Sequence, residues 1–116
     1  MPKNTQSEFW NYIDRLLSSS QVVIDRPKDS AHPEFEDMIY PVDYGYLAGT
    51  TSSDGAGIDV WRGSGDMQQV SGIVCTVDLL KRDAEIKILL GCSEDEMATI
   101  VDFLNSEYMG CWLVRR

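Results

Sequence analysis

The strongest constraint on the fold of this chain is the alternation of apolar and polar residues that begins at Val70. In the segment Val70–Leu80 the alternation is that of a strand with one buried face. The side chains predicted to face inward are Ile73, Cys75, Val77 and Leu79. Thr76 and Asp78 are predicted to face outward, and a second strand, Ala84–Leu90, follows after a short polar break.

Shorter predicted elements surround this strand pair. Strands are expected over residues 22–24, 44–48, 58–61 and 111–114, with a long polar loop over residues 26–40. Helices are expected only near the two ends: one over Ser7–Ser18, and one that follows Ser93 and has an apolar face of Met97, Ile100, Val101 and Leu104. Closely spaced strands between terminal helices predict an α+β fold built on a small barrel, as a single domain over residues 1–116.

The charge of the chain limits its partners. With 116 residues and a formal net charge of -9, the protein is not expected to bind a nucleic-acid backbone or an anionic membrane. An anionic substrate fits this charge only if cations lie between the substrate and the protein. Binding of phosphate groups would therefore indicate bound metal.

The cysteines and the start of the chain predict a location. Cys75, Cys92 and Cys111 are far apart, and His32 is the only histidine, so a zinc site is not expected. Buried, reduced thiols and the absence of an apolar signal region predict a soluble, cytoplasmic protein.

Two neighbouring segments place acidic and aromatic residues around one turn. Tyr40–Tyr46 reads Tyr-Pro-Val-Asp-Tyr-Gly-Tyr, and Asp54–Asp59 reads Asp-Gly-Ala-Gly-Ile-Asp. A turn that contains glycine can direct the side chains of Asp54 and Asp59 into one space, where a hard cation would relieve their repulsion. A magnesium or calcium site and a solvated acidic hairpin loop are both consistent with this pattern.

A third acidic group lies on the strand that precedes Leu90. Asp83, Glu85 and Lys87 occupy alternate positions and so share one face of the strand, with Asp78 on the same side. Two carboxylates beside an ammonium can hold a cation and a phosphate oxygen together. The alternative is a solvated strand face with an internal ion pair.

The order and spacing of these segments resemble the soluble, magnesium-dependent (family I) inorganic pyrophosphatases. The core of that family reads Tyr-Pro-x-Asn-Tyr-Gly-Tyr/Phe and then Asp-Gly-Asp-Pro-x-Asp, and the resemblance runs from about residue 22 to 92. It implies a five-stranded barrel similar to the oligonucleotide-binding fold, with flanking N- and C-terminal helices. The chain departs from the family pattern at Ala56 and Gly57, which replace the central aspartate and a proline. The family's hairpin with an active-site arginine before Tyr40 is also absent, and Arg26 or His32 could fill that role.

The resemblance also implies roles for individual residues. The implied magnesium ligands are Asp54, Asp59, Asp83, Glu85 and Asp25. The implied phosphate-binding residues are Tyr44, Lys28, Lys87 and Arg26. With an alanine at position 56, proton transfer would fall to another carboxylate, of which the candidates are Asp43, Asp25 and Glu85.

Two functional hypotheses follow from the resemblance. The first is a magnesium-dependent phosphohydrolase that converts pyrophosphate and water into two phosphates, or that acts on a small phosphate ester. The second is a non-catalytic or redirected protein with the pyrophosphatase fold, which binds a metal-phosphate ligand or a protein partner. In either case the bacterial members of the family imply a homo-oligomer.

Overall fold

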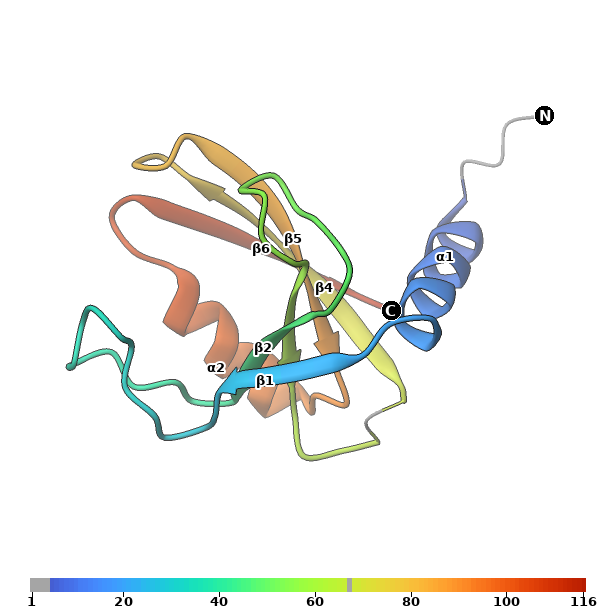
Figure 1. Cartoon of the computed structure of the whole chain (residues 1–116), viewed down its shortest axis with the longest axis horizontal. Coiled ribbons are helices and arrows are strands. Elements are labelled where there is room, and N and C mark those ends of the chain that lie inside the picture. Colours follow the sequence, from blue (N-terminus) through green and yellow to red (C-terminus); the bar gives the residue numbers. More distant parts are fainter. Residues whose placement is uncertain (1–4, 67) are drawn as a thin grey trace.

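Six strands form one mixed sheet in the computed structural model, which describes residues 5–66 and 68–116 (Figure 1). The strand order is β1–β2–β3–β5–β4–β6, and only β3 and β5 run parallel. The strands are β1 (Val22–Arg26), β2 (Asp43–Leu47), β3 (Asp59–Arg62), β4 (Val70–Asp78), β5 (Asp83–Leu90) and β6 (Met109–Arg115). Each strand predicted from the sequence is therefore present, and the prediction of an α+β fold is confirmed.

The sheet does not close into the predicted five-stranded barrel. β1 and β6 stand at the two edges, and no ladder joins them within the described residues. β6 runs antiparallel to β4 from Met109 to Arg115, so it adds a sixth strand at the edge of the sheet. β1 has only five residues, and its pairing with β2 is interrupted by a register shift at Asp25.

Each helix begins where its capping residues predict. α1 (Gln6–Ser18) starts after Thr5, whose Oγ1 accepts a hydrogen bond from the Glu8 backbone N–H at 3.2 Å. α2 (Glu94–Leu104) starts with the complete capping box of Ser93 and Glu96. Neither helix in the described part of the chain is long and apolar enough to cross a bilayer.

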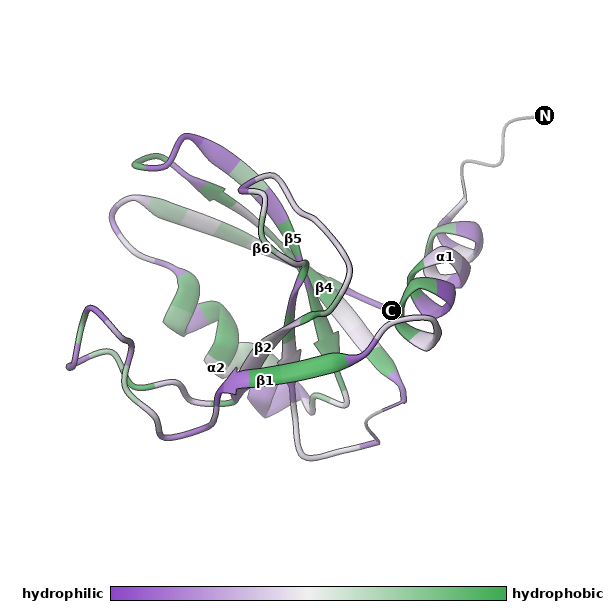
Figure 2. Cartoon of the chain, viewed as in Figure 1, coloured by the Kyte–Doolittle hydropathy of each residue, from purple (hydrophilic) through white to green (hydrophobic). Residues whose placement is uncertain are grey.

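The core consists of two apolar clusters, one on each face of the sheet. Consecutive residues such as Val60 and Trp61 belong to different clusters, because neighbouring side chains on a strand point to opposite faces. The cluster beneath α1 contains Trp10, Leu47, Val60, Val70, Ile73, Ile88 and Leu90. The cluster beneath α2 contains Tyr40, Val42, Trp61, Val74, Leu89, Cys92, Met97 and Ile100. In Figure 2, β1 is mostly hydrophobic, and it turns hydrophilic where the chain enters the long loop before β2.

The predicted burial of the side chains on β4 and β5 is wrong toward the tip of their hairpin. Thr76 is 3% exposed, whereas Val77 and Leu79 are 53% and 61% exposed. Ile86, which lies on the same strand face as the buried Ile88, is 43% exposed. The reason is visible in Figure 1, where the β4–β5 hairpin extends beyond both helices, so its tip lacks the layer that covers Ile73.

Candidate functional site

A polar pocket of about 420 Å³ lies on the sheet face that also carries Trp61 and Val74. Its walls come from all six strands and from the turn between β2 and β3. We call it the polar pocket. It is lined by Asp25, Arg26, Tyr44, Gly45, Tyr46, Asp54, Ala56, Gly57, Asp59, Thr76, Asp78, Lys81, Asp83, Glu85, Lys87 and Met109.

The register of the sheet explains why residues far apart in the sequence meet here. The parallel pairing of β3 with β5 places Asp59 beside Lys87, although 28 positions separate them. On the other side of β5, Thr76 of β4 lies opposite Glu85. Because β5 lies between β3 and β4, its polar side chains are held in the middle of the site.

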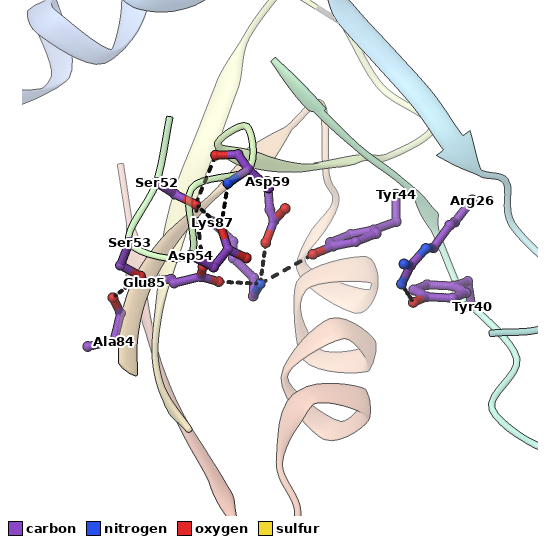
Figure 3. A network of polar contacts seen from close by, with 11 residues as sticks. Arg26, Tyr40, Tyr44, Ser52, Ser53, Asp54, Asp59, Ala84, Glu85 and Lys87 are labelled. Atoms are coloured by element: carbon purple, nitrogen blue, oxygen red, sulfur yellow. Dashed lines mark hydrogen bonds and ion pairs between the residues drawn. The ribbon is translucent and has the colours of Figure 1, made fainter. Parts of the chain in front are cut away.

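Lys87 forms the centre of the polar network (Figure 3). Its Nζ lies 2.6 Å from Asp59 Oδ2, 3.3 Å from Glu85 Oε2 and 3.2 Å from the Tyr44 hydroxyl. Only 5% of Lys87 is exposed, so this is not the solvated strand face that the sequence left open. The ammonium is held by two carboxylates in a site with little access to water.

Tyr44 is held as a neutral phenol at the edge of this network. Burial, and then the nearby Asp59 carboxylate, raise the pKa of Tyr44 well above its usual range. Its ring packs 4.5 Å from that of Trp61 and 5.4 Å from that of Tyr40, measured between centroids. A neutral phenol fixed in this way can donate a hydrogen bond to an anionic ligand.

The turn that carries Asp54 is tied to β5 by serine side chains. Asp54 Oδ1 accepts hydrogen bonds from the Ala56 backbone N–H at 2.9 Å and from the Ser52 hydroxyl at 2.8 Å, and these bonds lower the pKa of Asp54. Ser52 Oγ also lies 3.4 Å from Glu85 Oε1. Burial raises the pKa of Glu85, as do Asp59 and Asp54, although Lys87 opposes them. Sequence reasoning missed Ser52, whose signal was its place just before an Asp-Gly turn.

Arg26 reaches the other side of the pocket. Its Nη1 donates to the Tyr40 hydroxyl, and its guanidinium lies 5.5 Å and 6.0 Å from the ring centroids of Tyr40 and Tyr44 (Figure 3). The ring of His32 stacks on that of Tyr40, with 6.2 Å between their centroids, and His32 is not among the pocket-lining residues. Arg26 and His32 were the two candidates for the role of the family's active-site arginine, and of these only Arg26 lines the polar pocket.

The structure brings most of the predicted site residues together, but not all of them. Asp43 and Lys28 are not among the residues that line the polar pocket. Asp43 instead accepts hydrogen bonds from the Lys28 backbone N–H at 2.8 Å and from Arg62 at 3.2 Å. The predicted residues that do line the pocket are Asp25, Arg26, Tyr44, Asp54, Asp59, Asp83, Glu85 and Lys87. Two residues not expected at the site also line the pocket: Lys81, and Thr76, which was predicted to face outward.

The predicted magnesium ligands do not form a preformed metal site. Over residues 5–66 and 68–116, no group of three or more His, Cys, Asp or Glu side chains is placed to hold a metal ion. The geometry gives the reason, because the Lys87 ammonium lies between Asp59 and Glu85, and Asp54 is hydrogen-bonded within its own turn. As they are arranged, these residues do not fit a resident magnesium cluster.

The charge of the pocket is nevertheless strongly negative. Six carboxylates line it against three cationic side chains, Arg26, Lys81 and Lys87. A free anion would meet net repulsion in such a site. An anionic ligand would have to bring positive charge with it.

Comparison with known proteins identifies the fold. No family profile and no curated protein sequence matches the chain. Solved structures do match, among them an inorganic pyrophosphatase from Coxiella burnetii, with a TM-score of 0.60 and 16% identity over 81% of this chain and 84% of that one. An inorganic pyrophosphatase from Helicobacter pylori matches with a TM-score of 0.56 and 17% identity, over 83% and 82% of the two chains. An inorganic phosphatase from Anaplasma phagocytophilum matches with a TM-score of 0.52 and 18% identity, over 81% of each chain.

These matches show a shared fold across most of the chain. The resemblance drawn from the Tyr40–Tyr46 and Asp54–Asp59 segments is thus supported at the level of the fold. At 16–18% identity the matches do not assign roles to single residues, which remain predictions.

Proposed function

We propose that the polar pocket binds pyrophosphate, or a small phosphate ester, as its magnesium complex and hydrolyses it. The chain would then be a pyrophosphatase-like phosphohydrolase. The observation that carries this proposal is the convergence of Tyr44, Asp59, Glu85 and Lys87 in one pocket of a fold shared with solved pyrophosphatases.

The charge of the pocket supports a metal-bound substrate over a free anion. The carboxylates outnumber the cationic side chains two to one, so a diphosphate needs cations to enter. Magnesium usually binds phosphate oxygens together with one or two carboxylates and several waters, without a dedicated protein cage. Magnesium that arrives with the substrate is therefore compatible with carboxylates that form no metal site of their own.

The cationic, neutral and acidic side chains of the pocket would contact different parts of the metal-substrate complex. Lys87, Arg26 and Lys81 line the pocket as the groups able to pair with phosphate oxygens. Tyr44, kept neutral by its surroundings, would donate a hydrogen bond to a further oxygen. The surrounding carboxylates would accept hydrogen bonds from the waters of the metal complex.

One observation favours a second function, binding of the same ligand without turnover. Ala56 stands in the turn where the resembled family has a carboxylate, and its backbone N–H is bonded to Asp54. Loss of a general base costs about a hundred- to ten-thousand-fold in rate. A pocket that lacks this general base could still bind the ligand without hydrolysing it.

Two measurements on the purified protein separate these functions. The first is phosphate release from pyrophosphate with magnesium and after chelation, and with small phosphate esters. The second is calorimetric titration with methylene diphosphonate, a non-hydrolysable analogue, in the presence of magnesium. Release that stops on chelation supports the enzyme, and binding without release supports the second function. If neither occurs in the wild type, both proposals are wrong.

Matched variants connect either result to the pocket. Tyr44→Phe removes one hydroxyl from the polar network and should weaken release or binding. Tyr12→Phe removes an exposed hydroxyl from α1, outside the pocket, and should change neither.

We also propose a homo-oligomer, as the sequence predicts. Large apolar side chains are exposed on the β4–β5 hairpin and on the edge strand β6, where Trp112 is 73% exposed. Light scattering that finds only the 13.1 kDa species at micromolar concentration would contradict this. The cytoplasmic location stays a prediction of the sequence.

A further inference from the structure

Lys87 occupies the position that a bridging cation would take between two carboxylates. Its Nζ lies 2.6 Å from Asp59 Oδ2 and 3.3 Å from Glu85 Oε2. The three side chains are only 7%, 20% and 10% exposed, in the order Lys87, Asp59, Glu85. We infer that the Lys87 ammonium replaces a resident divalent cation, so that the wild-type pocket holds none of its own between these carboxylates.

The ammonium and a divalent cation would compete for this place. Magnesium binds carboxylate oxygens at about 2.0–2.1 Å and calcium at about 2.3–2.6 Å. An ion bound between Asp59 Oδ2 and Glu85 Oε2 would therefore compete with the ammonium for the same two oxygens. The two positive charges would also repel each other in a site with little water to screen them.

The fold keeps the ammonium in place. Lys87 lies on β5, which is hydrogen-bonded to β3 on one side and to β4 on the other. The Tyr44 hydroxyl, 3.2 Å from Nζ, is a third partner. Movement of the side chain into solvent would leave two poorly solvated carboxylates side by side, which is costly.

Removal of the lysine charge should therefore create a cation site. Without it, Asp59 and Glu85 would face each other across an unfilled space. Asp54 would add to their repulsion, since Ser52 hydrogen-bonds to Asp54 and lies 3.4 Å from Glu85. A divalent ion would relieve this repulsion. The inference needs no phosphate ligand, so it stands or falls independently of the proposed function.

The test compares Lys87→Met with Lys81→Met. Both variants lose one positive charge from the polar pocket, but Lys81 is exposed, and it is Lys87 that pairs with Asp59 and Glu85. The probes are Mg²⁺ alone, measured as a rise in melting temperature over sodium chloride of equal ionic strength, and Mn²⁺ alone, measured by electron paramagnetic resonance. We expect Lys87→Met to bind Mn²⁺ at least about tenfold more tightly than the wild type, because a competing charge is gone. Lys81→Met should behave like the wild type.

The site of any gained binding is checked by a double variant. Addition of Asp59→Asn to Lys87→Met should abolish the gain. The inference is wrong if wild type and Lys87→Met bind Mn²⁺ equally tightly, if Lys81→Met gains as much, or if the gain survives Asp59→Asn.

The inference can also be tested if Lys87→Met fails to fold. Folding that is restored by Mg²⁺ supports the inference. If the variant does not fold with or without Mg²⁺, Mn²⁺ titration of the wild type against Asp59→Asn decides. Binding to the wild type that is lost in Asp59→Asn overturns the inference, and equal weak binding to both supports it.

Discussion

Asp59→Asn should destabilise the protein far more than the loss of one carboxylate at its surface. The ion pair that it breaks joins side chains that are only 7% and 20% exposed, at 2.6 Å. Breaking a buried pair by removal of one partner costs about 3–5 kcal/mol, because the other charge stays buried. Here Glu85 remains 3.3 Å from Lys87, and an asparagine oxygen can still accept a hydrogen bond. We therefore expect a loss of about 2 kcal/mol in the free energy of unfolding, below the usual range for an isolated buried pair.

Urea denaturation followed by tryptophan fluorescence measures this loss. With a slope of about 1.5 kcal/mol per molar urea, the midpoint should fall by about 1.3 M. The matched control is Asp14→Asn, which breaks the pair with Arg116 at the same distance of 2.6 Å, but between side chains that are 38–41% exposed. The control should cost no more than about 1 kcal/mol. Equal midpoints for the two variants would refute the argument that burial gives the Lys87 network its strength.

Three further predictions test other parts of the structure. Gly45→Ala should lower the free energy of unfolding by about 3 kcal/mol in the same urea assay, since its Cβ would lie 1.8 Å from a backbone oxygen of β1. Gly110→Ala is its control, where an added Cβ meets nothing within 4 Å, and equal losses would contradict this reading. Burial raises the pKa of the Cys92 thiol to about 12, so folding keeps a proton that the unfolded chain loses above its ordinary thiol pKa. Stability should therefore fall by roughly 1 kcal/mol as the pH rises from about 8 to 10, and this fall should be smaller in Cys92→Ala. Ala56→Asp adds a third carboxylate to the 54–59 turn. This variant should hydrolyse pyrophosphate faster, or magnesium should raise its melting temperature by more than that of the wild type. If neither change is observed, this turn is not the metal site.

The sequence predicts which residues share a strand face, but not which face is covered. Alternation along the strand expected over residues 58–61 places Val60 and Trp61 on opposite faces, as the two core clusters show, because side-chain direction follows from the backbone alone. It misplaces Thr76 and Val77, because the reach of each helix over the sheet depends on tertiary packing. Local patterns carry no information on how far the β4–β5 hairpin extends beyond its covering layers.

The candidate site shows the same division between local and non-local information. The turn between Asp54 and Asp59 and the spacing of Glu85 and Lys87 are local, and they can be predicted from the sequence. The pair of Asp59 and Lys87 depends on the parallel register of β3 and β5, which no short pattern specifies. Burial of Lys87 could not be predicted for the same reason, since lysine on a polar strand face is normally solvated.

The two unusual features of the pocket, Ala56 and the enclosed Lys87, are physically connected. Asp59, Glu85 and Lys87 together carry a formal charge of only one negative unit, which a partly buried site can tolerate. A third carboxylate beside them, at position 56, would double that net charge to two negative units. A divalent cation would then be the favourable partner, because it offsets both negative units at once. With an alanine at position 56, the net charge of Asp59, Glu85 and Lys87 stays at one negative unit, and Lys87 alone can hold the two carboxylates together.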